Sequence, residues 1–274
     1  MSLPIAMQVY SMRDEANQDL EKVLRELKDM GYDAVELFSL HGKKPEEVAA
    51  ICQKVGIDPI SAHVPYDEMV ADPAGTMKAY ATVGCRFVAV PYLTDDKRAG
   101  TPAWEAVKEN IRMLGAAAKK EGMTLLYHNH DFEFQKTDGE YMLDNLYRTV
   151  SADLLETELD TCWVKVGGED PAAYIEKYSG RCPLVHLKDF SGNKNAATYQ
   201  LIGMEGQQRK NVEETEKFSL RPVGSGVQDM PAIIDAAIKA GAQCLIVEQD
   251  NPDEGHTPMQ CAKISREYLK SIGY

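Results

Sequence analysis

Helical and strand-like hydrophobic patterns alternate along the whole chain. Stretches with apolar residues at helical spacing, such as QDLEKVLRELKDM before Gly31, end at a glycine, and a short apolar run follows. A glycine just past a helix adopts the left-handed conformation without steric cost, so each junction predicts a helix end. The junctions are GYDAVEL from Gly31, GIDPIS from Gly56, GCRFVAV from Gly84, GMTLLYH from Gly122, GRCPLVHL from Gly180 and GAQCLIVE from Gly241.

Eight such strand runs predict a closed barrel. Six follow the glycines, and PIAMQV near the N-terminus and LLETELD near residue 157 complete the set. Short, mostly apolar runs are typical of a parallel sheet buried on both faces. Eight strand–helix units in 274 residues favour a (β/α)8 TIM barrel over an open doubly wound sheet. The first turn, SMRDEANQ, also lacks the glycine fingerprint of dinucleotide-binding folds. Prolines fit the first turns of the intervening helices: Pro45, Pro73, Pro102, Pro171 and Pro258.

One long segment departs from this regular alternation. Residues 190–222, after the seventh strand, are mostly polar and are followed by the glycine-rich PVGSGV. Long insertions on the catalytic face of a barrel usually cover the substrate. We therefore expect a single domain over residues 1–274 with a substrate-covering loop at about 190–222, and we expect Arg221 to reach the substrate from the base of that loop.

Composition narrows the range of partners. The chain is 44% hydrophobic and 27% charged, and its net charge of −13 argues against nucleic acid, which requires clustered Lys and Arg. Six cysteines lack CxxC spacing, and several lie in apolar runs, which predicts buried thiols in a reducing compartment. No apolar run approaches the roughly 20 residues that span a bilayer. We expect a cytoplasmic enzyme of small neutral molecules with no membrane partner, and we allow for a homodimer.

Polar side chains collect at the predicted strand ends, where barrel enzymes place their active sites. These residues are Gln8, Glu36, His63, His128 with His130, Asp160, His186 with Lys188, and Glu248. Alternate residues of a strand share a face, so four strands can direct His128, Asp160, His186 and Glu248 to one point if that face is internal. Two imidazoles and two carboxylates suit Mn²⁺, Zn²⁺, Co²⁺ or Fe²⁺ better than Ca²⁺.

Several of these residues also have structural interpretations. His63, in ISAHVPY, can be a hydrogen-bonded core histidine or a catalytic one, and Glu36 can anchor a loop or contact the substrate. Glu156 and Glu158 share the parity of Asp160, so they either face the barrel interior or show that the strand frame slips there. Trp163 packs in the core or forms a wall facing the substrate.

The order of motifs resembles the xylose isomerase-like superfamily of sugar isomerases and epimerases, including sugar phosphate isomerase/epimerase proteins, and is close to its inosose dehydratase-like branch. The resemblance covers the whole chain. It rests on GYDAVEL, LLYHNHDFEF, ELDTCWVKVGGEDP, HLKDF, PVGSGVQDMPAII and VEQD. It implies one divalent ion, with Mn²⁺ or Zn²⁺ preferred and Co²⁺, Fe²⁺ or Mg²⁺ as alternatives. The implied ligands are His128, Asp160, His186 and Glu248.

One position departs from the pattern of the epimerases. Many of them have a glutamate on the fifth strand, which exchanges protons with the glutamate of the eighth, whereas this chain has His128. Glu248 then needs another partner, and the candidates are His130, Glu133 and Lys188. We expect Glu248 to abstract the α-proton of a ketose or related polyol to give an enediolate, with Lys188 stabilising the oxyanion.

The outcome of that step stays open at this point. Returning the proton gives isomerisation or epimerisation, and expelling a β-leaving group makes the protein a lyase or dehydratase of a keto-inositol or 3-keto-sugar. Two other classes remain as alternatives. An apurinic endonuclease would need more metal ligands and a basic groove, and a barrel that binds sugar without chemistry would leave the ligand quartet unexplained.

Overall fold

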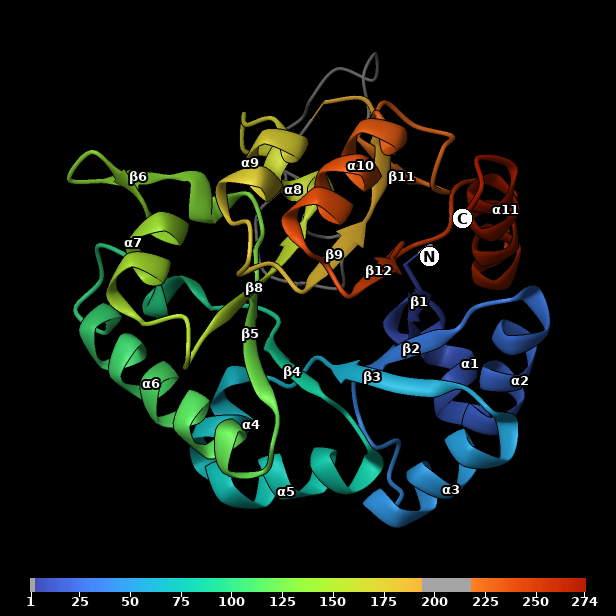
Figure 1. Ribbon diagram of the computed structural model, residues 1–274, viewed down its shortest axis with the longest axis horizontal. Helices are drawn as coiled ribbons and strands as arrows, with labels where there is room; N and C mark the ends of the chain where they lie inside the picture. The colour runs from blue at the N-terminus through green and yellow to red at the C-terminus, as the bar shows by residue number, and fades with distance from the viewer. Residues whose placement is uncertain (1–2, 194–217) are drawn as a thin grey trace.

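The computed structural model describes residues 3–193 and 218–274, and its centre is an eight-stranded parallel sheet (Figure 1). The strands are β1 (Ile5–Gln8), β2 (Ala34–Leu37), β3 (Asp58–Ala62), β4 (Phe87–Val90), β5 (Thr124–His128), β8 (Glu156–Asp160), β9 (Leu184–Leu187) and β12 (Cys244–Val247). They neighbour one another in the order β3-β2-β1-β12-β9-β8-β5-β4. A parallel bridge between His63 and Ala89 joins β3 to β4, so the sheet closes as the predicted TIM barrel.

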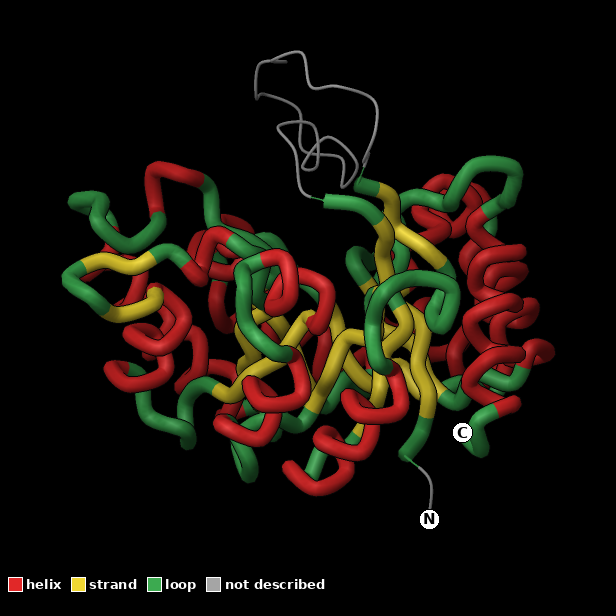
Figure 2. The backbone as a smooth tube through the Cα atoms, turned by 90° about the horizontal axis from the view of Figure 1, so that it is seen from above, coloured by secondary structure: helices red, strands yellow, loops and turns green. Residues whose placement is uncertain are grey.

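Helices surround the strands on the outside, as the view from above shows (Figure 2). They are α1 (Arg13–Gln18), α2 (Leu20–Met30), α3 (Pro45–Val55), α4 (Tyr66–Ala71), α5 (Pro73–Val83), α6 (Trp104–Lys120), α7 (Met142–Thr149), α8 (Thr161–Val166), α9 (Pro171–Lys177), α10 (Met230–Ala240) and α11 (Pro258–Ser271). Short 3-10 turns lie at Val9–Met12, Asp95–Lys97 and Phe132–Phe134. Within the two described stretches, no helix is long and apolar enough to cross a membrane.

The predicted helix boundaries follow the expected local chemistry. Gly31 ends α2 at φ 95° and Gly241 ends α10 at φ 85°, a conformation that other residues adopt only with strain. Four of the five prolines open helices, whereas Pro102 only precedes α6, which begins at Trp104. All six cysteines are buried and unpaired, as the sequence predicts.

Strand parity fills the barrel in two layers. Small and apolar side chains close its lower part: Ala6, Ala34, Ile60, Phe87, Ala89, Leu126, Leu184, Cys244 and Ile246. Two residues further along several strands, the inward positions become polar, as with Gln8 after Ala6 and His128 after Leu126. These nine residues, called the apolar plug below, fill the barrel beneath a polar layer.

The segment after β9 is more regular at its ends than the sequence suggests. Residues Asp189–Ser191 form β10, which pairs antiparallel with β11, Ser219–Arg221. Three-residue strands that pair across a long insertion carry no periodic signal, which is why the sequence did not predict them. The rest of the expected loop, residues 194–217, lies outside the described residues. A second small ladder pairs β6, Lys136–Thr137, with β7, Glu140–Tyr141.

The apolar plug should carry much of the stability of the barrel. Leu126 is fully buried in it, so Leu126→Ala should lower the free energy of unfolding by about 2–5 kcal/mol, the usual cost of a cavity at such a site. Ile238→Ala is the matched control, because Ile238 is 44% exposed on α10. Urea denaturation measures both, and equal losses in the two variants would show that the plug is not the core.

Candidate functional site

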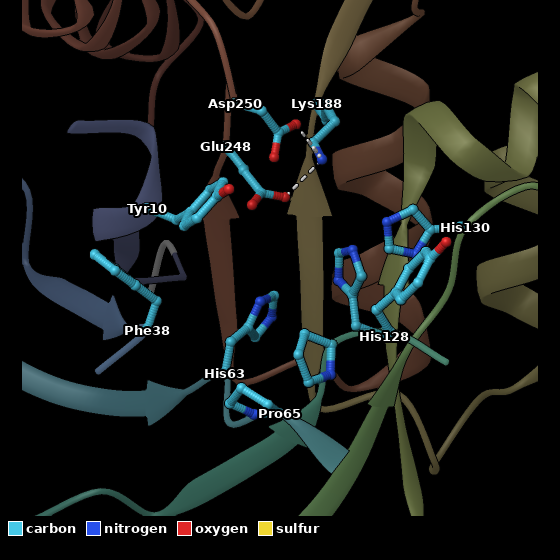
Figure 3. Close-up of a pocket in the computed structure, with 11 residues that line it drawn as sticks. Tyr10, Phe38, His63, Pro65, His128, His130, Lys188, Glu248 and Asp250 are labelled. Atoms are coloured by element: carbon cyan, nitrogen blue, oxygen red, sulfur yellow. Dashed lines mark ion pairs between the residues drawn. The ribbon is translucent and has the colours of Figure 1, made fainter. Parts of the chain in front are cut away.

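A pocket of about 220 Å³ opens above the polar layer at the carboxyl ends of the strands (Figure 3). Five predicted site residues line it: His63, His128, His130, Lys188 and Glu248. Six further residues complete the lining: Tyr10, Phe38, Pro65, Pro91, Tyr92 and Asp250. Tyr10 and Phe38 lie on one side of the pocket, and His128 and His130 lie on the opposite side.

The four predicted ligands come together at the base of this pocket. One donor atom from each of His128, Asp160, His186 and Glu248 lies within 4.8 Å of the others. Nδ1 of His186 is 3.0 Å from Oε2 of Glu248, and Nε2 of His128 is 3.8 Å from Oδ2 of Asp160. Two ligands bound about 2.1 Å from one ion lie roughly 3.0–3.4 Å apart, so the group needs little adjustment to hold a metal.

Local structure sets the position of Asp160. It ends β8 and is the N-cap of α8, where its Oδ1 accepts a hydrogen bond from the Trp163 N–H at 2.9 Å. Oδ2 is thereby directed away from the helix and toward the cluster. The Asn129 side chain fixes the strand end, because it accepts from the Asp160 N–H at 3.0 Å and donates to the Asp160 carbonyl at 3.3 Å.

A second group of possible ligands lies deeper and shares two residues with the first. It comprises His63, His128, Glu158 and His186. Nε2 of His63 is 2.6 Å from Oε2 of Glu158, a hydrogen-bond separation shorter than that of two ligands on one ion. This group is therefore better described as a hydrogen-bonded support beneath the candidate metal site. Glu158 is fully buried among these residues, so the side chains that share the parity of Asp160 on β8 face the barrel interior at this position.

Glu36 belongs to the same support. Its Oε2 lies 2.8 Å from Nε2 of His186 and accepts a hydrogen bond from Nε2 of Gln8 at 2.7 Å. Glu36 thus holds one nitrogen of His186 while the other, Nδ1, faces Glu248. A carboxylate behind a histidine in this way fixes the ring and strengthens it as a metal ligand. Gln8 was expected among the polar residues of the active site, and Glu36 either to anchor a loop or to contact the substrate. Both are fully buried below the pocket and do not line it.

The charges of the cluster are strongly coupled. Burial lowers the pKa of His128 to about 3, so this imidazole is neutral and able to coordinate. Burial also acts to lower the pKa of His186, but the carboxylates of Glu158 and Glu36 outweigh it and raise the pKa well above the usual value. For Glu248, burial favours protonation, yet Lys188 and His186 hold its pKa well below the usual range.

The donor set fits a divalent cation. Five carboxylates, each at most 5% exposed, surround the site: Glu36, Glu158, Asp160, Glu248 and Asp250. Oδ2 of Asp160 has no hydrogen bond within the described residues, although Nζ of Lys188 lies 3.1 Å away. Buried carboxylate oxygens are costly without a cation or donors. An ion between Asp160 and Glu248 would offset much of this cost.

Lys188 is the central cation among the described residues of the site. Its ammonium group lies 2.7 Å from Glu248, 2.9 Å from Asp250 and 3.1 Å from Asp160. The contacts to Glu248 and Asp250 are the dashed lines of Figure 3. The side chain is 1% exposed, so these carboxylates hold Nζ in one position at the edge of the pocket.

His130 is held in the pocket wall by aromatic stacking. Its ring lies between those of Phe132, at 5.6 Å, and Trp163, at 5.5 Å. Trp163 is fully buried, so it supports the wall from behind and does not line the pocket. Glu133 also lies behind the pocket. Its carboxylate accepts from the Tyr127 hydroxyl and from the His130 N–H, and it thereby fixes the loop that carries His130.

Arg221 does not line the pocket. Its Nε donates to the Ser191 hydroxyl at 2.9 Å, and its guanidinium lies 3.5 Å from the Asp253 carboxylate. In the structure it fastens β11 to β10 and to the loop after β12. The loop at about 190–222 was predicted to cover the substrate, and residues 194–217 of it lie outside the described residues.

Sequence reasoning missed six lining residues, and their spacing carried a partial signal for four of them. Tyr10, Phe38, Pro65 and Asp250 each follow a predicted site residue by two positions, namely Gln8, Glu36, His63 and Glu248. Strand alternation alone does not place them, because Tyr10 lies in the 3-10 turn Val9–Met12 and the other three lie beyond the ends of their strands. Pro91 and Tyr92 follow β4, which carried no predicted site residue.

A family model of xylose isomerase-like TIM barrels matches residues 24–272. The chain belongs to this family. Inosose dehydratase of Geobacillus kaustophilus is 23% identical over 96% of this chain and 90% of its own. A sugar phosphate isomerase/epimerase of Parabacteroides distasonis superposes with a TM-score of 0.77 at 21% identity, over 100% of this chain and 95% of its own. IolI protein with a bound zinc atom superposes with a TM-score of 0.70 at 16% identity, over 98% of both chains.

The supporting role of Glu36 behind His186 can be tested in this xylose isomerase-like barrel through its affinity for a metal ion. Glu36→Gln keeps a hydrogen-bond acceptor for His186 but removes the charge, so the affinity for Mn²⁺ or Zn²⁺ should fall about tenfold. Competition with a chromophoric chelator measures the affinity without any substrate. Glu105→Gln on the exposed face of α6 is the matched control. An unchanged affinity in Glu36→Gln would exclude the supporting role.

Proposed function

We propose that the protein is a divalent-metal-dependent enzyme that removes the α-proton of a keto sugar or keto polyol. The observation that carries this proposal is the convergence of His128, Asp160, His186 and Glu248 at the base of a pocket that Glu248 and His128 also line. A site of this kind combines residues that can bind a metal with a carboxylate that can reach a substrate in the pocket. The enzymes to which the chain is similar support a carbohydrate substrate.

Glu248 and Lys188 have separate roles in the proposed reaction. When bound, the divalent ion would polarise the substrate carbonyl and orient the adjacent hydroxyl. Glu248 is the general base, because it lines the pocket and is held as the carboxylate by Lys188. Lys188 keeps its ammonium group at the pocket edge, where it stabilises negative charge that develops on the substrate oxygen.

The opposite wall determines the fate of the substrate after proton removal. There, His128 and His130 line the pocket, and burial lowers the pKa of both. A proton returned to the same or a neighbouring carbon gives isomerisation or epimerisation. Neutral imidazoles in place of a second carboxylate also suit a lyase. There the β-hydroxyl would leave as water with the proton that Glu248 removed from the α-carbon, and the neutral ring of His130 would donate a hydrogen bond to it. We therefore retain elimination as the second candidate, in keeping with the dehydratase relatives.

Proton abstraction can be tested before the product is known. In D2O with Mn²⁺, the protein should incorporate deuterium at the α-carbon of a member of a panel of ketoses and ketoinositols, as measured by NMR. Glu248→Gln should lower the rate at least about 100-fold, because an amide cannot accept the proton. Glu105→Gln should exchange like the parent.

Metal content must be determined for each variant, because Glu248 is also a proposed ligand. Near-parental exchange by Glu248→Gln with metal bound would show that the base lies elsewhere. The absence of exchange across the panel by the metal-loaded parent would contradict the proposed function.

The role of His128 gives a second test. His128→Glu should still bind the metal and exchange the α-proton, and it places a carboxylate on the wall opposite Glu248. If a lyase outcome in the parent reflects the missing carboxylate, the variant should gain epimerisation, which chiral chromatography of the products detects. Loss of metal from the variant, seen by elemental analysis, would contradict the expectation that a carboxylate at position 128 can replace the imidazole as a metal ligand.

A further inference from the structure

The ammonium group of Lys188 contacts the oxygens that the candidate metal site needs. Its Nζ lies 2.7 Å from Oε2 of Glu248 and 3.1 Å from Oδ2 of Asp160. The same Oε2 faces Nδ1 of His186 at 3.0 Å, and the same Oδ2 faces Nε2 of His128 at 3.8 Å. Oδ1 of Asp160 is engaged as the cap of α8. The lysine and a metal ion therefore require the same two carboxylates.

Asp250 supplies a third contact to this ammonium group. Its Oδ2 lies 2.9 Å from Nζ of Lys188, as the second dashed line of Figure 3 shows. Among the described residues, Asp250 belongs to neither group of possible metal ligands. An ammonium group donates at most three hydrogen bonds, so three carboxylates match its full capacity. Asp250 is thus the carboxylate partner of Lys188 that the metal does not need.

The backbone of Asp250 is held in place by contacts of its own. Its carbonyl accepts a hydrogen bond from Arg13 at 2.6 Å, and Arg13 also donates to the side chain of Asn251 at 3.1 Å. The N–H of Gln249 donates to the hydroxyl of Ser11 at 3.0 Å. These hydrogen bonds tie the loop after β12 to the segment that follows β1. The carboxylate of Asp250 is therefore a fixed anchor for an ammonium group.

The charges allow both cations to be present together. Asp160, Glu248 and Asp250 carry three negative charges when ionised, and Lys188 with one divalent ion carries three positive charges. Two cations that share an oxygen repel each other strongly in a buried site. Repulsion is weaker when the metal takes Asp160 and Glu248 and the ammonium group stays on Asp250.

We propose that Asp250 is a positioning residue, which keeps the ammonium group of Lys188 at the pocket when Asp160 and Glu248 bind the metal. Before metal binds, Lys188 balances the charge of these two carboxylates, and it thereby competes with the metal. Afterwards its ammonium group remains at the pocket, where it stabilises charge on the substrate oxygen. The proposal rests on the proposed function and deepens it, because it states which residues of the chain regulate metal binding at that site.

Removal of the competing cation gives the first test. Lys188→Met has a similar length and no charge, so its affinity for Mn²⁺ should rise at least about tenfold. Competition with a chromophoric chelator measures the affinity without substrate. Lys165→Met, on the exposed face of α8, is the matched control and should bind Mn²⁺ like the parent. An unchanged or lower affinity in Lys188→Met overturns the proposal.

Asp250 can be tested with Lys188 in place. Asp250→Asn leaves the ammonium group on the oxygens that the metal needs, so the affinity for Mn²⁺ should fall at least about tenfold. Asp250→Glu keeps the charge and should recover most of this loss. Asp253→Asn makes the same change of charge in the same loop outside the pocket and is the matched control. Equal losses in the two Asn variants overturn the proposal, and this comparison suffices if Lys188→Met does not fold.

The two proposals fail separately. Because the affinities are measured without substrate, unchanged affinities in the Lys188 and Asp250 variants would contradict the positioning role and leave α-deuterium exchange by the parent standing. The absence of exchange by the metal-loaded parent would contradict the proposed function and leave the measured affinities standing.

A double variant shows whether Asp250 acts through Lys188. In the Lys188→Met background, Asp250→Asn should lower the affinity for Mn²⁺ at least about threefold less than it does in the parent, because no ammonium group is left to position. The same chelator competition measures all four proteins of this cycle. Equal losses in the two backgrounds would show that Asp250 acts through its own charge, and they would overturn the proposal.

Discussion

The concentration of negative charge in the mouth of the barrel is the constraint on which the rest of the site depends. Five buried carboxylates share a space with one lysine and three imidazoles, and such a group is stable only if each oxygen has a cation or a donor nearby. The protein meets this requirement in two layers. Below, Glu36 and Glu158 are paired with His186 and His63. Above, Asp160 and Glu248 both contact the ammonium group of Lys188. Asp160 also lies near Nε2 of His128, and Glu248 lies near Nδ1 of His186.

This layering explains why so many polar residues can be buried without contacting a ligand. The lower layer fixes the ring of His186 so that Nδ1 faces the pocket side, and helix α8 fixes one oxygen of Asp160 so that the other faces the cluster. Aromatic stacking does the same for His130, between Phe132 and Trp163. Catalysis by metal-assisted proton transfer requires such fixed geometry, because small displacements of the base or ligands lower the rate steeply.

Asp189 fixes the glycine-rich loop after β11 next to the strand that carries Lys188. Its carboxylate accepts hydrogen bonds from the N–H groups of Gly224, Gly226 and Gln228. The side chain of Gln228 in turn donates to the Lys188 carbonyl. Buried hydrogen bonds outside the pocket therefore help to hold the backbone of a residue that lines it.

The sequence by itself determined the barrel and the group of candidate ligands. Glycine stops, apolar strand runs and their number are local signals, and the parity of β-strands carries them to the inward positions of His128, Asp160, His186 and Glu248. Parity cannot distinguish depth, however. Gln8, Glu36 and His63 all end strands, yet only His63 reaches the pocket. The roles of Glu133, Trp163 and Arg221 were decided by tertiary structure alone, because loop paths and contacts between distant segments set which side chains face the pocket.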